Sequence, residues 1–269
     1  MILYGNIAKD AIEQQISNTL AKIREKGESV RIVTLRVGED PADLAYEKQI
    51  RKRCASFEID VVSQRFQTQA ELIEAIERAN EDDSIDGIML FKPLPKTWNA
   101  DEVVSHIAHE KDIDGACGEN SDYVPCTAEA CVNLIRAYGI DPKDKQCVVV
   151  GRSATVGRPL RMLLERAGAS VTVCHSQTTD LPGETRKAEL LFVACGKPKM
   201  IDASCVSPGQ IVIDVGFHAG EDGICGDVDA DAIASIVDSY SPVPRGVGSV
   251  TMPTLLLHAV QAHERRNCP

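Results

Sequence analysis

The stretch from residue 148 to residue 176 constrains the fold more than any other part of the sequence. An apolar run at 148–150 is followed by Gly151 and Gly157, a helix-like segment and a second apolar run at 171–174. This order predicts a strand, a phosphate-binding loop, a helix and a strand, because one glycine permits the tight turn and the other lets the helix approach the sheet. The loop reads G-x-S-x-x-x-G rather than G-x-G-x-x-G, so a glycine turn without a ligand is the alternative.

Polar side chains beside this loop indicate which dinucleotide it would bind. Arg152 lies in the loop and Ser176 follows the second strand, where the adenosine ribose of a dinucleotide would lie. A guanidinium can form a bidentate pair with a 2′-phosphate, and a hydroxyl can hydrogen-bond to it. An NAD site more often has Asp or Glu at the end of that strand, and position 176 carries neither. We therefore expect NADP, with NAD as the alternative.

Composition excludes several classes of protein. A chain of 269 residues that is 43% hydrophobic and 26% charged is typical of a globular protein of about two domains. The net charge of −11 and the aromatic content of 4% argue against a nucleic-acid partner. We expect no membrane partner and a cytoplasmic location, because the sequence shows neither a secretory signal nor a long apolar run.

Metal-binding patterns are weak in this sequence. The ten cysteines form no C-x-x-C pair and no Cys/His quartet, so we expect neither a zinc site nor a disulfide framework. His106 and His109 are three residues apart on an expected helix, but no third ligand accompanies them. The sequence therefore predicts no metal site.

Helical patterns alternate with apolar runs along the chain, which predicts crossover units and mainly parallel sheets, an α/β fold. The expected helices besides the one after the glycine loop are residues 10–26, 43–56, 70–80, 100–109, 127–138 and 251–265. The expected strands are residues 30–37, 60–66, 87–91, 147–150, 170–174, 190–194 and 211–215. We place the domain boundary near residues 116–126.

Short motifs rich in Gly, Pro and Asp mark both halves of the chain. In the first half they are Val37-Gly38-Glu39-Asp40-Pro41-Ala42 before Tyr46, Asp86-Gly87-Ile88 before Pro93-Leu94-Pro95, and Lys111-Asp112-Ile113-Asp114-Gly115. In the second half they are Pro125-Cys126-Thr127, the 151–159 loop, Cys174-His175-Ser176, Gly196-Lys197-Pro198, Val212-Ile213-Asp214-Val215-Gly216, Gly226-Asp227-Val228, Pro242-Val243-Pro244 and Gly246-Val247-Gly248. In this order and spacing they resemble the methylenetetrahydrofolate dehydrogenase/cyclohydrolase family.

The resemblance implies two α/β domains and an active site in the cleft between them. Residues 1–120 with 252–269 would form a folate-binding domain to which the last helix returns, and residues 121–251 would form a Rossmann domain for NADP or NAD. The dehydrogenase of this family oxidises 5,10-methylenetetrahydrofolate to the 5,10-methenyl form by hydride transfer to the nicotinamide. Many members also hydrolyse that product to 10-formyltetrahydrofolate, and members are usually homodimers.

The resemblance also assigns residues to the two halves of the site. The implied folate-binding residues are Tyr46, Asp114, Pro244, Gly246 and Gly248, with Tyr46 and Asp114 as the candidate catalytic residues. The implied cofactor-binding residues are Gly151, Arg152, Ser153, Val156, Gly157, His175, Ser176, Gly196 and Gly216, although His175 is also expected to be structural at a strand end. Asp114 has the alternative of capping a turn. Arg245 replaces a family Gly and either contacts the substrate or faces solvent.

Two positions depart from the family pattern where hydrolysis needs proton transfer. In the family a Lys one helical turn after the Tyr does this work, assisted by a Gln two residues before Pro-Leu-Pro. Here these positions hold Ile50 and Phe91. Because residues four apart share a helix face, Tyr46 and Ile50 should both look into the cleft. Arg53, one turn further along, is the one plausible replacement and a poor general base.

The sequence therefore predicts a methylenetetrahydrofolate dehydrogenase that has lost cyclohydrolase activity. One alternative is a bifunctional dehydrogenase/cyclohydrolase in which Arg53 or a water network still supports hydrolysis. A second alternative, from another class, is a non-catalytic protein that binds folate or a nucleotide. The intact phosphate loop argues against this second alternative, since such a protein has little need for a working cofactor site.

Overall fold

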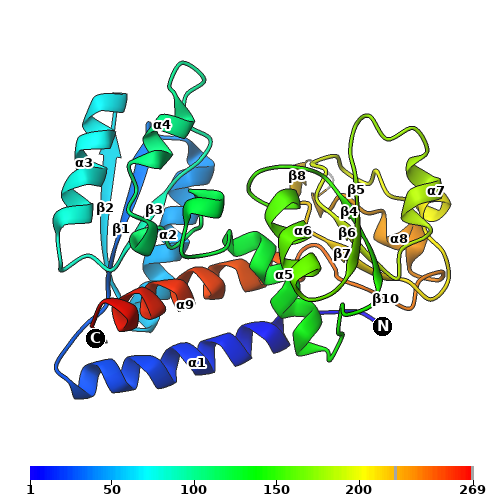
Figure 1. Cartoon of the computed structure of the whole chain (residues 1–269), viewed down its shortest axis with the longest axis horizontal. Coiled ribbons are helices and arrows are strands. Elements are labelled where there is room, and N and C mark those ends of the chain that lie inside the picture. Colours follow the sequence, from blue (N-terminus) through cyan, green and yellow to red (C-terminus); the bar gives the residue numbers. More distant parts are fainter. Residues whose placement is uncertain (221–222, 268–269) are drawn as a thin grey trace. The chain divides into compact units, whose positions relative to one another are not determined.

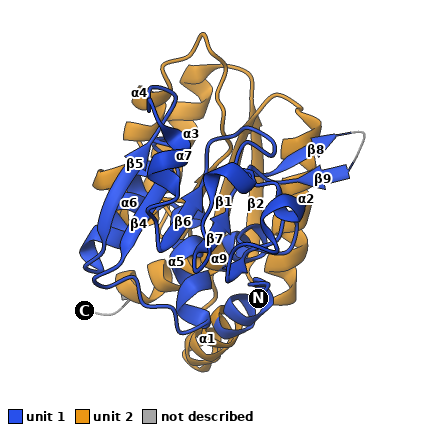
Figure 2. Ribbon diagram, turned by 90° about the vertical axis from the view of Figure 1, so that its right-hand side faces the viewer, with its two compact units in different colours: residues 1–11, 125–253 blue, residues 12–124, 254–269 orange. Residues whose placement is uncertain are grey.

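The computed structural model describes residues 1–220 and 223–267 and separates the chain into two compact units (Figure 1). Unit 1 contains residues 1–11 and 125–253, and unit 2 contains residues 12–124 and 254–269, as coloured in Figure 2. Two 20-residue helices, α1 (Asn6–Glu25) and α9 (Gly248–Asn267), contribute residues to both units. The functional domains expected at 1–120 with 252–269 and at 121–251 stay a prediction.

Unit 1 is built on a five-stranded parallel sheet in the order β10-β7-β6-β4-β5. Its strands are β4 (Gln146–Val150), β5 (Ser170–Cys174), β6 (Leu190–Val193), β7 (Ile211–Asp214) and β10 (Ser239–Tyr240). The chain passes from β4 to β5 on one side and later enters β6 on the other side of β4, so the strand order reverses at β4. In open α/β sheets, ligands bind beyond the carboxyl ends of the strands at such a reversal.

The remaining elements of unit 1 are short helices and one hairpin. The helices are α5 (Cys126–Ala137), α6 (Gly157–Arg166), α7 (Leu181–Thr185), η3 (Ala203–Cys205) and α8 (Ala230–Ile233). An antiparallel pair, β8 (His218–Gly220) and β9 (Gly223–Cys225), follows β7. The inner strands β4 and β6 are buried and apolar, as expected for a parallel sheet with both faces covered.

Unit 2 is built on a three-stranded parallel sheet in the order β2-β1-β3. Its strands are β1 (Arg31–Val37), β2 (Asp60–Phe66) and β3 (Gly87–Leu90). Its helices besides α1 and α9 are α2 (Pro41–Ser56), α3 (Gln69–Glu81), α4 (Ala100–Ser105), η1 (His109–Lys111) and η2 (Gly118–Asn120). Local sequence starts these helices: Asp40 caps α2, and Thr68 with Glu71 forms a capping box on α3.

The two parallel sheets confirm the predicted α/β fold class. The residues of α9 from Thr254 onward group with unit 2, which confirms that the last helix returns to the N-terminal domain. The helix predicted over residues 100–109 is too long, because α4 ends at Ser105. The Asn80 side chain donates to the carbonyl of His106 (2.7 Å) and accepts from the N–H of Ala108 (3.0 Å), so those groups do not continue the helix.

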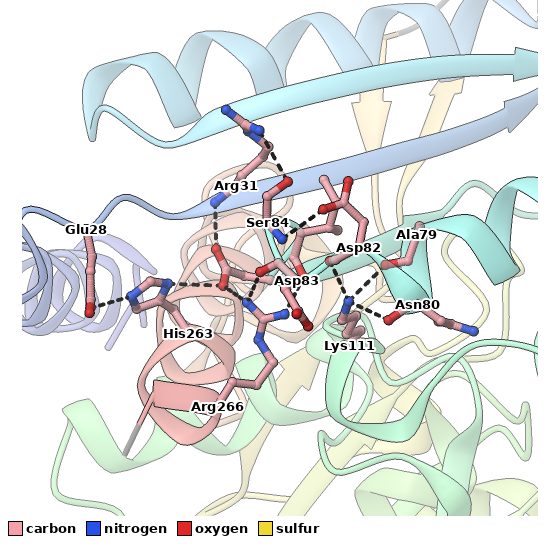
Figure 3. Close-up of polar contacts among 12 residues, drawn as sticks. Glu28, Arg31, Ala79, Asn80, Asp82, Asp83, Ser84, Lys111, His263 and Arg266 are labelled. Atoms are coloured by element: carbon pink, nitrogen blue, oxygen red, sulfur yellow. Dashed lines mark hydrogen bonds and ion pairs between the residues drawn. The ribbon is translucent and has the colours of Figure 1, made fainter. Parts of the chain in front are cut away.

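A cluster of polar residues around the buried side chains of Asp86 and His263 holds the end of α9 within unit 2 (Figure 3). Asp86, just before β3, accepts hydrogen bonds from the main-chain N–H of Arg31 (2.7 Å) and from the guanidinium of Arg266 (2.5 Å). The imidazole of His263 lies between two carboxylates, 3.0 Å from Asp86 and 3.0 Å from Glu28. We call these five residues the Asp86 cluster. It fixes α9 at the amino ends of the strands.

Lys111 adds a second buried polar contact at the same end of unit 2 (Figure 3). Its ammonium donates to the carbonyl oxygens of Ala79, Asn80 and Asp82, at 2.8–2.9 Å. These carbonyls lie at or just beyond the C-terminal end of α3, where a cation compensates the unsatisfied acceptors and the helix dipole. Burial lowers the pKa of Lys111, and its three acceptors show that it serves the fold.

Candidate functional site

A pocket in unit 1 lies beyond the carboxyl ends of β4, β5 and β6, at the reversal of strand order. Its lining residues are Val150, Gly151, Arg152, Ser153, His175, Ser176, Leu181, Ala194, Cys195, Lys197 and Met200. Five of the nine residues predicted to bind a cofactor are in this set. We call it the unit 1 pocket. Its position agrees with the general location of ligand sites in open α/β sheets.

Gly151 occupies a backbone position that no other residue would fit. Its φ angle of +128° is in a region that side chains rarely adopt. A Cβ atom there would clash with the carbonyl oxygen of Ala194, at the end of β6, and a Cβ at Gly157 would clash with the carbonyl of Gly151. The loop after β4 therefore packs closely against β6 and against the start of α6, which leaves its outer face open for a ligand.

The main-chain N–H groups of this loop fall into two sets, one bonded within the protein and one available to a ligand. The hydroxyl of Ser153 accepts from the N–H groups of Val156 (3.1 Å) and Gly157 (3.4 Å), so it caps the start of α6. Within the part of the chain that the structure describes, the N–H groups of residues 152–155 have no protein acceptor. Those N–H groups, rather than the ones at the helix start itself, are free to bind an anion.

Polar side chains surround the same loop. Arg152 and Ser176 are exposed and line the pocket, and so does Lys197 in the turn after β6. The ring nitrogen Nδ1 of His175 accepts from the N–H of Gln177 (3.2 Å), so His175 is a turn residue as well as a lining one. Sequence reasoning did not single out Lys197. Its motif, Gly196-Lys197-Pro198, belongs to the family pattern, but nothing in the sequence spacing predicted that Lys197 would lie beside Arg152.

Gly196 and Gly216 lie in turns beside the pocket rather than among its lining residues. Gly196 has a left-handed φ of +67°, and its N–H donates to the buried carboxylate of Asp227 (2.9 Å). A Cβ at Gly216 would clash with Asp227 as well. Cys195 lines the pocket, but burial and the nearby Asp227 charge raise the pKa of its thiol to about 11, which makes it a poor nucleophile. Both glycines thus shape the turns.

In unit 2, the structure brings Tyr46 and Phe91 together. Their rings are in edge-to-face contact, with centroids 6.1 Å apart, where α2 meets the residue that follows β3. Phe91 is 4% exposed and Ile50 is 0% exposed, whereas Tyr46 is partly exposed. Ile50 is thus a core residue of unit 2. Neither the Ile50 nor the Phe91 side chain carries an atom that could transfer a proton.

Two charged residues of α2, Glu47 and Arg53, are committed to other contacts. Glu47 is buried and pairs with Arg36 (3.2 Å), and it also accepts from the Thr34 hydroxyl (3.2 Å). Arg53 forms an ion pair with Glu13 of α1 and lies over the Phe57 ring, 4.9 Å from its centroid. These contacts hold Arg53 at the C-terminal end of α2. They give no support to Arg53 as a replacement for the missing Lys.

Asp114 lies in the loop before η2 and is partly exposed. The turn cap in this loop is Asp112, whose two carboxylate oxygens accept from the N–H groups of Ala116 (2.8 Å) and Cys117 (2.7 Å). The imidazole of His258 on α9 lies 2.8 Å from the carbonyl of Ile113 and therefore fixes the residue before Asp114. The interpretation of Asp114 as the cap of this turn is thus unnecessary.

Pro244, Gly246 and Gly248, predicted to bind folate, belong to unit 1. Pro244 and Gly246 lie between β10 and α9, and Gly248 is the first residue of α9. A Cβ at Gly246 would clash with the carbonyl oxygen of Pro242, so this loop is tightly folded. Arg245 is exposed in a left-handed conformation (φ +80°), with its guanidinium 5.2 Å from the centroid of the Tyr4 ring. Arg245 thus stacks on an aromatic ring of its own unit.

The structure offers no cluster suited to a metal ion among residues 1–220 and 223–267. His106 caps the end of α4 and His109 lies in η1, so they do not share a helix as predicted. Across those same residues, no helix is both long and apolar enough to cross a membrane.

Comparison with known proteins assigns both halves of the chain. Residues 3–114 match the catalytic domain of tetrahydrofolate dehydrogenase/cyclohydrolase, and residues 125–267 match its NAD(P)-binding domain. This chain belongs to the tetrahydrofolate dehydrogenase/cyclohydrolase family. The unit 1 pocket therefore lies in the NAD(P)-binding domain, and Tyr46, Ile50 and Phe91 lie in the catalytic domain of a family member.

Individual family members agree with this assignment over the full length. The chain is 37% identical to a Clostridium botulinum protein named bifunctional protein FolD, over 99% of both chains. It superposes on the bifunctional FolD of Campylobacter jejuni with a TM-score of 0.95 and 34% identity, covering 99% of both chains. It also superposes on the Trypanosoma brucei FolD, solved with NADP and an inhibitor, with a TM-score of 0.92 and 29% identity over 100% and 99% of the two chains.

Proposed function

We propose that this family member is an NADP-dependent 5,10-methylenetetrahydrofolate dehydrogenase without cyclohydrolase activity. Its substrate would bind against Tyr46 and Asp114, and its cofactor in the unit 1 pocket. NAD is the alternative cofactor. The proposal goes beyond family membership in two respects, the choice of nucleotide and the loss of hydrolysis, and each depends on different residues.

The residues of the unit 1 pocket fit a dinucleotide phosphate. The close contact of Gly151 with Ala194 and the N–H groups of residues 152–155 form a cradle for the pyrophosphate. Arg152, Ser176 and Lys197 supply a positive and hydrogen-bonding surface for a 2′-phosphate, and among the described residues no carboxylate lines the pocket. The dinucleotide complex of the Trypanosoma brucei relative contains NADP, which is consistent with this choice.

Hydride transfer requires little acid–base catalysis from the protein. A bound nicotinamide dinucleotide supplies the hydride acceptor, and the cation left on the methylene carbon is stabilised by the two flanking folate nitrogens. The chain's own residues therefore mainly have to hold the folate and the dinucleotide in the orientation that hydride transfer requires. An aromatic face at Tyr46 and a carboxylate acceptor at Asp114 suit a pterin ring, which is flat and carries N–H donors.

Hydrolysis of the methenyl product requires a positioned acid or base, because water has to attack the methenyl carbon and protons have to be transferred. The single observation that carries our proposal is that apolar side chains occupy the two positions expected to transfer protons. Ile50 is fully buried in the core, and Phe91 packs its ring against Tyr46. Arg53, the nearest substitute that the sequence offers, is paired with Glu13.

The second candidate is a bifunctional dehydrogenase/cyclohydrolase. The names of full-length relatives at 34–37% identity favour it, since they describe bifunctional proteins. In such an enzyme another group or a water network would have to replace the missing Lys and Gln. A pair of assays on one enzyme preparation separates the two candidates.

The first assay follows NADP and NAD reduction with 5,10-methylenetetrahydrofolate, and the second follows the decay of added 5,10-methenyltetrahydrofolate above its spontaneous rate. We expect reduction of NADP in preference to NAD and no enzyme-dependent decay. Enzyme-dependent decay at a rate comparable to reduction would establish the bifunctional candidate. Failure to reduce either nucleotide would favour a non-catalytic binding protein.

A further inference from the structure

A fully buried carboxylate in unit 1 is bonded to the turn that forms one wall of the pocket. Oδ2 of Asp227 accepts hydrogen bonds from the main-chain N–H groups of Cys195 (2.7 Å) and Gly196 (2.9 Å), the second and third residues after β6. One oxygen atom thus fixes two consecutive peptide groups.

Asp227 is itself held in place by a second buried carboxylate. Asp214, at the end of β7, accepts from the N–H groups of Asp227 (3.0 Å) and Val228 (3.0 Å). A Cβ at Gly226 would clash with the Asp214 carboxylate, so the two segments approach closely. The rigid end of β7 is therefore connected through Asp214 and Asp227 to the turn after β6.

The second oxygen of Asp227 has a partner on the hairpin. Nε2 of His218, in β8, lies 2.7 Å from Oδ1 of Asp227, and the His218 side chain is 25% exposed. Because a carboxylate oxygen accepts hydrogen bonds, the tautomer of His218 with its proton on Nε2 would donate this bond. With His218 on Oδ1 and two peptide groups on Oδ2, the orientation of the carboxylate is fixed from both sides.

The supported turn reaches the pocket directly. Ala194, Cys195 and Lys197 line the unit 1 pocket, and the Ala194 carbonyl abuts Gly151 of the phosphate loop. A shift of this turn therefore moves two walls of the pocket together. Asp227 and His218 do not line the pocket themselves, so any effect they have on a ligand passes through the turn.

We propose that Asp227 is a positioning residue for the dinucleotide and that His218 orients its carboxylate. This proposal rests on the proposed function, because it assumes that the unit 1 pocket binds NADP. It predicts that changes at these two residues weaken NADP binding and raise the KM for NADP. The kcat and the KM for 5,10-methylenetetrahydrofolate should stay near their original values, since the folate-side residues Tyr46 and Asp114 are untouched.

The test compares His218→Leu with His218→Gln, and Asp227→Asn with Asp231→Asn. Leu removes the donor to Asp227, whereas the Gln amide can still donate to it. Asp231 is an exposed acid in α8 and serves as the control. We expect the Kd for NADP, measured by titration calorimetry, to rise about tenfold for His218→Leu and at least that much for Asp227→Asn. His218→Gln and Asp231→Asn should stay within about twofold of the unaltered protein.

The outcomes separate this proposal from the proposed function. If the unaltered protein binds neither NADP nor NAD, the proposed function fails. If it binds NADP and folded His218→Leu binds it equally well, the positioning role is overturned and the proposed function stands. An equal loss in His218→Leu and His218→Gln also overturns it, because the hydrogen bond would then not matter. Should Asp227→Asn fail to fold, the two His218 variants still decide.

Discussion

The two units have parallel sheets, and three of their buried acids lie at different ends of them. In unit 1 the buried acids Asp214 and Asp227 lie beyond the carboxyl ends of the strands, next to the pocket. In unit 2 the buried Asp86 lies at the amino end of β3, where it holds α9. These acids thus contact the turn beside the pocket in one unit and the end of α9 in the other.

The carboxyl end of the unit 2 sheet shows what this difference means for chemistry. Phe91 follows β3 there, with Ile50 buried in the adjacent core, and the buried Glu47 is neutralised by Arg36. On our proposal, the cofactor half of the family pattern keeps its polar residues, whereas the half that would move protons has lost them. Hydride transfer and hydrolysis would then depend on separable parts of the chain.

The largest expected effect concerns the structural polar cluster of unit 2. Asp86→Ala leaves the His263 and Arg266 side chains without their shared acceptor, which should lower the free energy of unfolding by about 4 kcal/mol. Urea denaturation measures it. Glu165→Ala, which removes an exposed ion pair with Arg161, is the control and should cost less than about 0.5 kcal/mol. Equal effects of both variants would show that the Asp86 cluster is not structural.

The buried acid of unit 1 predicts a dependence of stability on pH. Burial raises the pKa of Asp214 to about 6, above its ordinary value of 3.8. An acid with a raised pKa in the folded state stabilises the fold while it is protonated, and this contribution is lost as pH rises through about 6. Relative to Asp214→Asn, the free energy of unfolding should therefore fall by about 2 kcal/mol between pH 4 and pH 6.5. Parallel pH profiles of the two proteins would contradict the buried setting of Asp214.

The glycine of the phosphate loop provides a direct test of the cofactor half. Gly151→Ala places a Cβ against the Ala194 carbonyl and should weaken NADP binding at least about a hundredfold, or about 2.7 kcal/mol. Gly220→Ala adds the same atom where no atom of the described residues lies within 4 Å and should leave the Kd unchanged. Calorimetric titration with NADP checks both. Normal binding by Gly151→Ala would place the dinucleotide elsewhere.

The choice between NADP and NAD depends on a cation in the same loop. Arg152→Gln removes the bidentate partner of a 2′-phosphate and should raise the Kd for NADP about tenfold, while the Kd for NAD changes less than twofold. Arg161→Gln alters an exposed arginine of α6 that does not line the pocket, and is the matched control. Equal losses for both nucleotides in Arg152→Gln would show that Arg152 does not contact the 2′-phosphate.

The smallest expected effect tests the proton-transfer half. Ile50→Lys combined with Phe91→Gln restores the side chains expected from the family pattern and should introduce a slow hydrolysis of 5,10-methenyltetrahydrofolate. The gain is limited because Ile50 is fully buried, so a lysine there has to displace core packing. The single variants are the controls. A folded double variant without any hydrolysis would show that further residues of the site have changed.

Of the strands that the structure describes in the two parallel sheets, the sequence predicted all but the two-residue β10, because parallel strands are short apolar runs bounded by turn residues. It overestimated α4, since the side chain of Asn80, twenty-six residues before His106, ends that helix. It missed the hairpin of β8 and β9, whose three-residue strands carry no clear alternation. Contacts between distant residues and very short strands leave no periodic signal.

The candidate site was predictable to a similar degree. The glycine loop with Arg152 and Ser176 could be read from spacing alone, and the structure places those residues in one pocket. Asp227 was visible as part of a motif, but its role was not, because its partners are main-chain N–H groups thirty-one and thirty-two residues away. Full burial of Ile50 also could not be predicted from helix periodicity. Periodicity shows which residues share a helix face, but not how deeply that face is buried.

The central claim, that hydride transfer persists without hydrolysis, is tested most directly by the stoichiometry of the products. NADPH and 5,10-methenyltetrahydrofolate are measured together during a single reaction of the unaltered protein with 5,10-methylenetetrahydrofolate. We predict that the two accumulate one for one after correction for spontaneous hydrolysis. Formation of NADPH while 10-formyltetrahydrofolate replaces the methenyl product at an enzyme-dependent rate would contradict the account.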